Sequence, residues 1–262
     1  MRIDLHNHTI LCNHAQGSVD EYITKAIELG VDVYGFSCHS PMDFDSKYRM
    51  KSEELVTYSQ MISNAQNKYQ DKILILMGLE VDFICNRENL IEKRILEYPF
   101  DYLIGSVHFL DEWGFDNPEF MAEYAKRNLE ECWEKYLKAI AKMAQSNLFQ
   151  IVGHFDLLKI FNHSPNQKLY QNIQKTLENI RDNKMVLEIN ASGFHKPIKE
   201  QYPSIEILKI AKKMEIPITF GSDAHSVDQV GFGYEECLKI AKNIGYKKAV
   251  YFKKKIPHMV EI

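Results

Sequence analysis

Short apolar runs alternate with longer amphipathic stretches along the whole chain. The apolar runs have the length and the β-branched or aromatic content of buried strands, whereas the longer stretches repeat their apolar positions at helical spacing. The longest helix is predicted over 118–145, where an aromatic and aliphatic stripe keeps this spacing. The pattern therefore predicts seven strands separated by helices, at residues 2–6, 33–37, 73–79, 102–107, 149–153, 185–190 and 216–220.

Several of the predicted helices begin or end at residues suited to that position. Ser18 followed by Glu21 is typical of a capping box, and Gly30 is suited to the end of the helix that starts there. Further helices are predicted over 52–69 and 87–97, and from residues 204 and 233 onward. Seven β-α units without a linker rich in proline or glycine predict an α/β fold. We expect one domain over 1–262, a closed or nearly closed barrel one unit short of a (β/α)8 barrel.

Composition and charge indicate an ordinary globular protein. The 262 residues include 45% hydrophobic and 26% charged residues, as in ordinary globular proteins. The formal charge of −4 provides no general attraction to nucleic acid or to an anionic membrane, and no apolar run approaches the length of a membrane span. The lysine-rich segment 247–255 is interpreted as a solvated face. These features predict a protein that binds neither nucleic acid nor membrane.

The five cysteines are scattered, odd in number and without a Cys-x-x-Cys pair, which favours a reducing compartment over a disulfide framework. The chain begins directly with a strand pattern and no basic-then-apolar leader, so we expect a cytoplasmic protein. Cys12 and Cys38 lie beside histidines. Thiolates bind zinc well, but we expect these two side chains to act as small buried hydrophobes.

Metal-binding residue types stand at the ends of the predicted strands. His6 and His8 flank one residue of an extended segment, so their side chains point the same way. In barrels of this kind reactive side chains gather at the carboxyl ends of the strands, which would bring all such residues into one cavity. The predicted ligands are seven histidines and two acids: His6, His8, His14, His39, Glu80, His108, His154, Asp223 and His225.

Imidazole combined with carboxylate suits zinc, iron or manganese. With three to four protein ligands per open catalytic metal, nine ligands and a bridging carboxylate are enough for two or three divalent ions. Two metal ions about 3.5–4 Å apart form the usual clamp for in-line displacement at phosphorus. The residues therefore indicate a metal-dependent phosphoryl-transfer site.

The chain resembles the polymerase-and-histidinol-phosphatase (PHP) phosphoesterases over essentially its whole length. The resemblance rests on His6-Asn7-His8, His14, Cys38-His39-Ser40, Gly78-Leu79-Glu80, Gly105-Ser106-Val107-His108, Gly153-His154-Phe155-Asp156 and Gly221-Ser222-Asp223-Ala224-His225. It implies a distorted (β/α)7 barrel with a trinuclear metal site. The implied ligands are His6, His8, Glu80 and Asp223 for the first metal, Glu80, His108 and His154 for the second, and His14, His39 and His225 for the third.

Two features are similar to the histidinol-phosphatase branch of that family. One is the stretch 188–197 followed by Tyr202-Pro203-Ser204, and the other is a length without an appended polymerase. Members of this branch often have arginine where His195 stands, so Lys196 or a protonated His195 would take over its contact with phosphate. Asn190, in the same stretch, and Lys159 are further predicted substrate or phosphate contacts. For Lys159 a solvated lysine is an equal alternative.

The resemblance implies hydrolysis of L-histidinol phosphate to L-histidinol, a step of histidine biosynthesis. We expect a metal-bridging hydroxide to attack phosphorus in line, with Glu80, Asp223 and His225 as the catalytic residues. The proton for the leaving alkoxide could come from Asp223, His195 or a metal-bound water. The ammonium and imidazole of this small-molecule substrate need acidic or polar partners, and the sequence does not choose among Asp43, Asp45, Asp111 and Glu112. Nor does it decide the oligomeric state.

Three other interpretations stay open at the level of sequence. The first is a PHP phosphoesterase that acts on another small phosphate ester, on nucleotides or on nucleic-acid ends. The second is a metal-binding PHP module without catalysis, although such modules tend to lose ligands and here none is missing. The third is an amidohydrolase, for which we would expect an eighth unit and a metal-bridging lysine at strand four, where this chain has His108.

Overall fold

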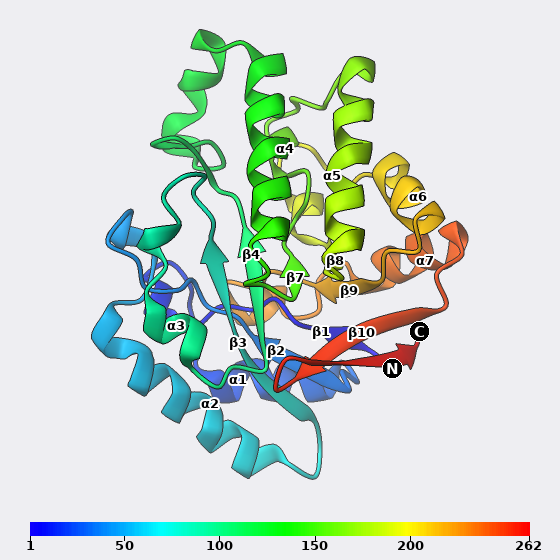
Figure 1. Ribbon diagram of the computed structural model, residues 1–262. Coiled ribbons are helices and arrows are strands. Elements are labelled where there is room, and N and C mark those ends of the chain that lie inside the picture. The colour runs from blue at the N-terminus through cyan, green and yellow to red at the C-terminus, as the bar shows by residue number, and fades with distance from the viewer.

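All seven predicted strands lie in one parallel sheet. The computed structural model describes residues 1–262, and its strands follow each other in chain order around the sheet (Figure 1). The two edge strands meet through hydrogen bonds at their carboxyl ends, from Leu5 N to Phe220 O (2.9 Å) and from Asp223 N to His6 O (2.8 Å), so the barrel is nearly closed. Its strands are β1 (Ile3–Asp4), β2 (Val33–Phe36), β3 (Leu74–Asp82), β4 (Tyr102–Ser106), β7 (Ile151–Val152), β8 (Val186–Asn190) and β9 (Ile218–Gly221).

The barrel interior is filled by side chains. Tyr102 shows how: its hydroxyl donates to Leu5 O (2.6 Å) and lies within 3.3 Å of Phe36 O. Gly35 and Gly78 leave room for this ring, because a methyl group at either position would overlap it. Both faces of such a parallel sheet are covered, which is why its strands appear in the sequence as continuous apolar runs.

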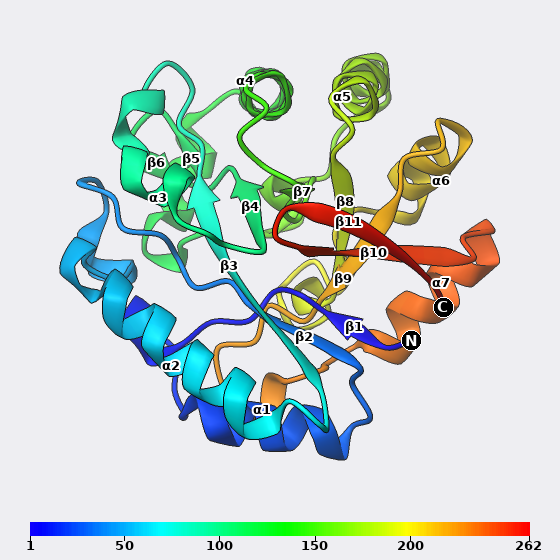
Figure 2. The ribbon, with the colours of Figure 1, turned by 60° about the horizontal axis from the view of Figure 1, so that its bottom comes forward.

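Seven helices surround the strands (Figure 2). The capping box is confirmed, since Ser18 Oγ accepts from Glu21 N (3.3 Å) while Ser18 N donates to Glu21 Oε2 (2.7 Å). Gly30 follows this helix with a φ of +68°. None of the helices combines the length and the apolar composition needed to cross a lipid bilayer. The helices are α1 (Val19–Glu28), α2 (Leu55–Tyr69), α3 (Lys93–Glu97), α4 (Leu129–Gln145), α5 (Tyr170–Asp182), α6 (Ile205–Lys213) and α7 (Tyr234–Ile244).

Two predicted helices are wrong in extent. The stretch 118–145 consists of a 3-10 segment, Pro118–Lys126, and the separate helix α4. The break comes at Asn128, whose side chain accepts from Glu130 N and Glu131 N at 3.0 and 3.4 Å and so starts a new helix. Of the stretch 87–97, only α3 is an α-helix, because Ile91 is extended between it and a 3-10 turn.

Two antiparallel hairpins were not predicted. The first, β5 (Phe109–Leu110) with β6 (Trp113–Gly114), follows β4 at the carboxyl end of the barrel. The second, β10 (Lys248–Lys253) with β11 (Ile256–Glu261), crosses the opposite, amino end of the barrel (Figure 2). The lysines of 247–255 are exposed on this second hairpin, which confirms their interpretation as a solvated face.

Candidate metal centre

The nine predicted ligands converge at the carboxyl end of the barrel, around Glu80. Glu80 Oε2 lies 3.3 Å from His6 Nε2 and 3.0 Å from His39 Nδ1. Glu80 Oε1 faces the other way and lies 2.9 Å from His154 Nε2 and 3.5 Å from His108 Nε2. The two carboxylate oxygens therefore face different groups of histidines, which is the arrangement of a bridging ligand.

Asp223 and the remaining histidines complete the cluster. Asp223 Oδ1 lies 3.1 Å from His8 Nε2. The ring of His225 stacks on that of His8, with centroids 3.9 Å apart, and lies 4.6 Å from the ring of His14. Asp223 has a φ of +56°, a conformation uncommon for a residue other than glycine, at the turn where β9 leaves the barrel. Strained backbone of this kind is concentrated at functional sites.

A second layer of acceptors holds the histidine rings in place. Nδ1 of His6 lies 2.7 Å from Glu188 Oε1, and Nδ1 of His108 lies 2.6 Å from Asp82 Oδ1. Backbone carbonyls do the same for His14 and His225, whose Nδ1 atoms lie 2.8 and 3.0 Å from Cys12 O and Asp223 O. Such partners fix the tautomer, so in these four rings Nε2 is the nitrogen left for a metal ion.

Unpartnered nitrogens show that the cluster fits divalent metal ions. Nε2 of His6 and Nε2 of His225 are buried and have no hydrogen-bond partner within the protein. A buried polar atom left in this way costs about 1–3 kcal/mol. A metal ion would satisfy both atoms, and imidazole with carboxylate is a donor set that zinc, iron and manganese accept.

The electrostatics of the cluster are strongly perturbed. Burial raises the pKa of Glu80, but the neighbouring His6, His39 and His108 outweigh it and hold the pKa well below its usual range. Burial disfavours the charged form of His108, yet Asp82 and Glu80 raise its pKa to about 10. For His225 burial prevails and lowers the pKa to about 4. The cluster thus contains ionised carboxylates that attract cations and, at His225, a neutral imidazole suited to bind one.

A cavity of about 460 Å³ opens above the cluster. Of the predicted substrate contacts, His195 and Lys196 line its wall, both largely exposed, and the His195 ring stacks on Phe232 with centroids 3.9 Å apart. Asp45 lines the cavity as well and is paired with Arg49 (3.4 Å). The loops after β2, β4 and β8 therefore form the walls above the metal ligands.

Lys159 and Asn190 do not line this cavity. Lys159 is buried, and its Nζ lies 3.0 Å from Asp156 Oδ2 and 2.5 Å from Glu200 Oε2, so neither a phosphate contact nor the alternative of a solvated lysine agrees with the structure. Asn190 Nδ2 donates to Glu188 Oε2 (3.1 Å) and to Asp223 Oδ2 (3.3 Å). Asn190 thus holds the side chain of Asp223, one of the predicted ligands, in place.

Comparison with known proteins agrees with this geometry. The family described as "PHP domain" matches residues 4–192 of the sequence, and the family described as "PHP-associated" matches residues 206–241. The chain belongs to the PHP family. A relative from Deinococcus radiodurans with the name "Probable histidinol-phosphatase" is 36% identical to this PHP protein over 255 residues, 97% of each chain. The histidinol-phosphatase of Bacillus subtilis is 29% identical, and the match covers 90% of the present chain and 98% of its own.

Among solved structures, the histidinol phosphate phosphatase of Lactococcus lactis, complexed with zinc, L-histidinol and phosphate, has a TM-score of 0.86 and 24% identity. The match covers 98% of both chains and confirms the fold of this PHP protein. The relatives confirm the predicted membership of the histidinol-phosphatase branch.

Several residues of the PHP site were missed in the sequence. Asp82 follows Glu80 by two residues on β3, so the period of a strand placed it on the same side. Glu188 is a lone charge inside an apolar run, which is a signal of a buried functional group. Arg49, which binds Asp82 (2.9 Å), and Asp116, which lines the cavity, lie in loops where no periodicity marks them.

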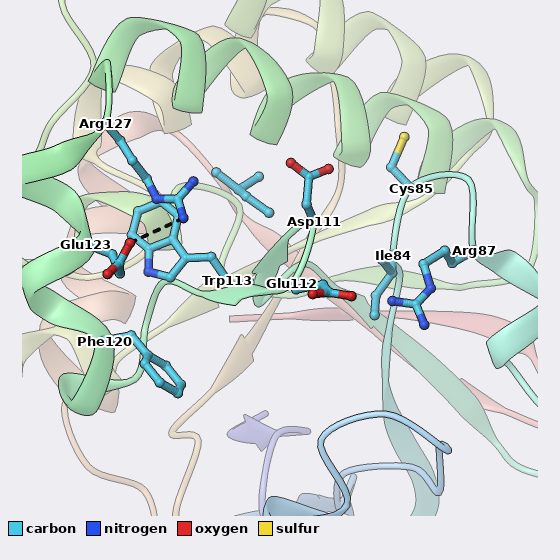
Figure 3. Close-up of a pocket in the computed structure, with 10 residues that line it drawn as sticks. Ile84, Cys85, Arg87, Asp111, Glu112, Trp113, Phe120, Glu123 and Arg127 are labelled. Carbon is cyan, nitrogen blue, oxygen red and sulfur yellow. Dashed lines mark ion pairs between the residues drawn. The ribbon is translucent and has the colours of Figure 1, made fainter.

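The structure also places the cysteines and the acids that the sequence offered as partners of the substrate ammonium. Cys12 and Cys38 are fully buried, and the five cysteines are free thiols. Asp111 and Glu112 do not reach the metal centre. They line a separate cavity of about 660 Å³ beside the β5–β6 hairpin (Figure 3). Asp43 is exposed and lines neither cavity.

Proposed function

We propose that this PHP protein is a metal-dependent histidinol-phosphatase, which hydrolyses L-histidinol phosphate to L-histidinol and phosphate. The observation that carries the proposal is the complete donor set: seven imidazoles and two carboxylates cluster at the carboxyl end of the barrel, and the two acids are held ionised. The names of the relatives from Deinococcus and Bacillus support the substrate. The structure from Lactococcus, with zinc, L-histidinol and phosphate, supports the pairing of this fold with this chemistry.

We propose two or three divalent ions, of zinc, iron or manganese. His6, His8, Glu80 and Asp223 would hold the first ion, Glu80, His108 and His154 the second, and His14, His39 and His225 the third. When bound, such ions activate water and offset the negative charge of the phosphoryl oxygens. The division of the Glu80 oxygens between His6 and His39 on one side and His108 and His154 on the other supports its bridging role.

The protein's own residues bind and orient the ester. His195 and Lys196 stand on the cavity wall, where the Lys196 ammonium attracts the phosphate. Water attacks phosphorus, the bond from phosphorus to the ester oxygen breaks, and the departing alkoxide takes up a proton. Asp223 is an unsuitable acid, because His6 and a hydrogen bond from His8 hold its pKa well below the usual range despite burial. Burial and Lys196 lower the pKa of His195 too, so the proposed proton donor is solvent in the cavity.

The test is phosphate release from L-histidinol phosphate beside nucleotides and sugar phosphates, with metal-loaded protein. We expect a strong preference for L-histidinol phosphate and a loss of about 100-fold or more in the Glu80→Gln variant. Glu112→Gln, outside the site, serves as the matched control and keeps full activity. Equal, slow turnover of every ester would overturn the substrate, and no turnover by the metal-loaded protein would overturn the enzymatic function.

We further propose that residues 1–262 act as one PHP phosphoesterase domain in the cytoplasm. The hairpin β10–β11 supports the first point, because it joins the last strand to the first residue through a hydrogen bond from the Met1 ammonium to Glu261 O (2.8 Å). The five free thiols fit a reducing compartment. Limited proteolysis that released a stable fragment retaining activity would contradict the single domain.

A further inference from the structure

The cavity above the metal centre has walls of opposite charge. On one wall, the loop after β8 carries His195 and Lys196. On another, the loop after β2 carries Asp45, the β5–β6 hairpin carries the aromatic ring of Phe109, and the segment after β6 carries Asp116. A ligand with an anionic and a cationic end would take one orientation here, because each end is attracted to a different wall.

Asp116 differs from every other acid of this cavity in having no partner. Glu80 and Asp223 face the histidines of the metal centre, and Asp45 and Asp82 both pair with Arg49. The carboxylate of Asp116 makes no hydrogen bond and no ion pair with the protein, although the residue is half-buried in the cavity wall. The carboxylate is therefore available to pair with a cationic group that enters the cavity.

We infer that Asp116 binds the ammonium group of the substrate and thereby determines its specificity. The inference rests on the proposed function and names the residue that recognises the organic part of the phosphate ester. Of the two nitrogen groups of L-histidinol phosphate, the primary amine carries a full positive charge at neutral pH and above, whereas an imidazole with an ordinary pKa of about 6.5 is mostly neutral. The ammonium is therefore the group that a free carboxylate selects.

The other acids near the site do not serve this purpose. Asp111, in the turn between β5 and β6, lines the separate cavity beside Glu112 (Figure 3) and pairs with Lys135 at 3.3 Å. Asp45 lies in the correct cavity, but its charge is neutralised by Arg49. Among these acids, Asp116 alone lines the cavity with a carboxylate that no hydrogen bond or ion pair engages.

The experiment compares two substrates on two proteins. L-histidinol phosphate and its deamino analogue, 3-(imidazol-4-yl)propyl phosphate, differ only in the ammonium group. We expect Asp116→Asn to lower kcat/KM for L-histidinol phosphate by about 10- to 100-fold and to leave kcat/KM for the analogue nearly unchanged. The variant should then hardly distinguish the two esters. Asp111→Asn, a matched change in the nearby turn between β5 and β6, should leave both values as in the natural protein.

The outcomes separate this inference from the proposed function. An equal loss on both esters, or no loss on either, would overturn the role of Asp116 while the phosphatase stands. If the natural protein hydrolyses other esters but not L-histidinol phosphate, the proposed substrate fails. The same comparison is then made with phosphoethanolamine and ethyl phosphate. A preference for the amine that Asp116→Asn abolishes upholds the inference, and its absence overturns it.

Discussion

At the scale of single residues, the buried acids behind the predicted metal ligands orient the side chains of the site. Glu188 is the clearest case. One of its oxygens binds Nδ1 of His6 (2.7 Å), and the other accepts from His154 N (2.8 Å) and from Asn190 Nδ2 (3.1 Å). One carboxylate thereby orients two ligands that come from different strands.

We predict that Glu188→Gln weakens metal binding by about 10- to 100-fold, as is usual when an outer partner of a ligand histidine is lost. Glutamine has one acceptor oxygen, so it cannot serve both His6 and the backbone of His154. Competition with a chelating dye would measure the affinity. Glu206→Gln, an exposed change on α6, is the control, and equal affinity in both variants would contradict the prediction.

The shifted histidines also predict how the stability of the metal-free protein depends on pH. Burial lowers the pKa of His225 to about 4, so between about pH 4 and 6.5 the folded state binds fewer protons than the unfolded state, and stability rises with pH. The pKa of His108 is raised to about 10, because Asp82 and Glu80 outweigh burial. Its contribution is complete below about pH 6.5 and is lost as the pH rises toward 10.

These two groups together predict a stability maximum near pH 6.5 for the metal-free protein. Urea unfolding at about pH 5, 6.5 and 9 would measure it, since the linkage acts on the free energy of unfolding. A stability that rose steadily up to about pH 9 would contradict the assignment of His108.

At the scale of elements, the hairpin β10–β11 stabilises the amino end of the barrel, opposite the carboxyl end where the candidate site lies. Asp101, just before β4, connects the hairpin to the barrel. Its Oδ1 accepts from Lys254 N (2.9 Å) in the hairpin, and its Oδ2 accepts from Met77 N (2.9 Å) in β3. The Asp101 backbone oxygen accepts from Lys255 N (2.7 Å). In barrel enzymes this end contributes to stability, whereas the loops at the other end carry function.

We therefore predict that Asp101→Ala lowers the free energy of unfolding by about 1–3 kcal/mol, because it leaves two backbone donors without an acceptor. Metal binding and kcat/KM should not change. Denaturant unfolding would give the stability, and hydrogen exchange should show earlier opening of β10–β11. Asp71→Ala, in an exposed turn, is the control. A loss of activity without a loss of stability would show that this end of the barrel does more than support the fold.

At the scale of the whole molecule, folding alone brings the nine ligands together. They extend from His6 to His225 along the chain, and only closure of the barrel brings their side chains into one cluster. An unfolded chain offers no such site, so metal binding and folding must be thermodynamically linked.

We predict that chelation lowers the thermal unfolding midpoint and that added zinc restores it in a concentration-dependent way. A ligand at 100 times its dissociation constant adds about 2.7 kcal/mol to the stability. Differential scanning calorimetry over a zinc titration would measure the shift. Glu80→Gln should show a much smaller one, and a midpoint independent of zinc would contradict the linkage.

The sequence by itself determined the seven strands and the places of the nine predicted ligands, and it did so for a simple physical reason. Strand periodicity is local, and one rule of topology places the carboxyl ends of parallel strands at the same end of the barrel. His6, Glu80 and Asp223 could therefore be assigned to one cluster from the sequence alone. Only the tertiary structure decided the partners of the remaining polar groups. Lys159 is bound by Glu200, from a distant loop, whereas Asp116 has no partner at all. Charges in loops are neutralised or left free by segments remote in sequence, and local spacing does not encode those contacts.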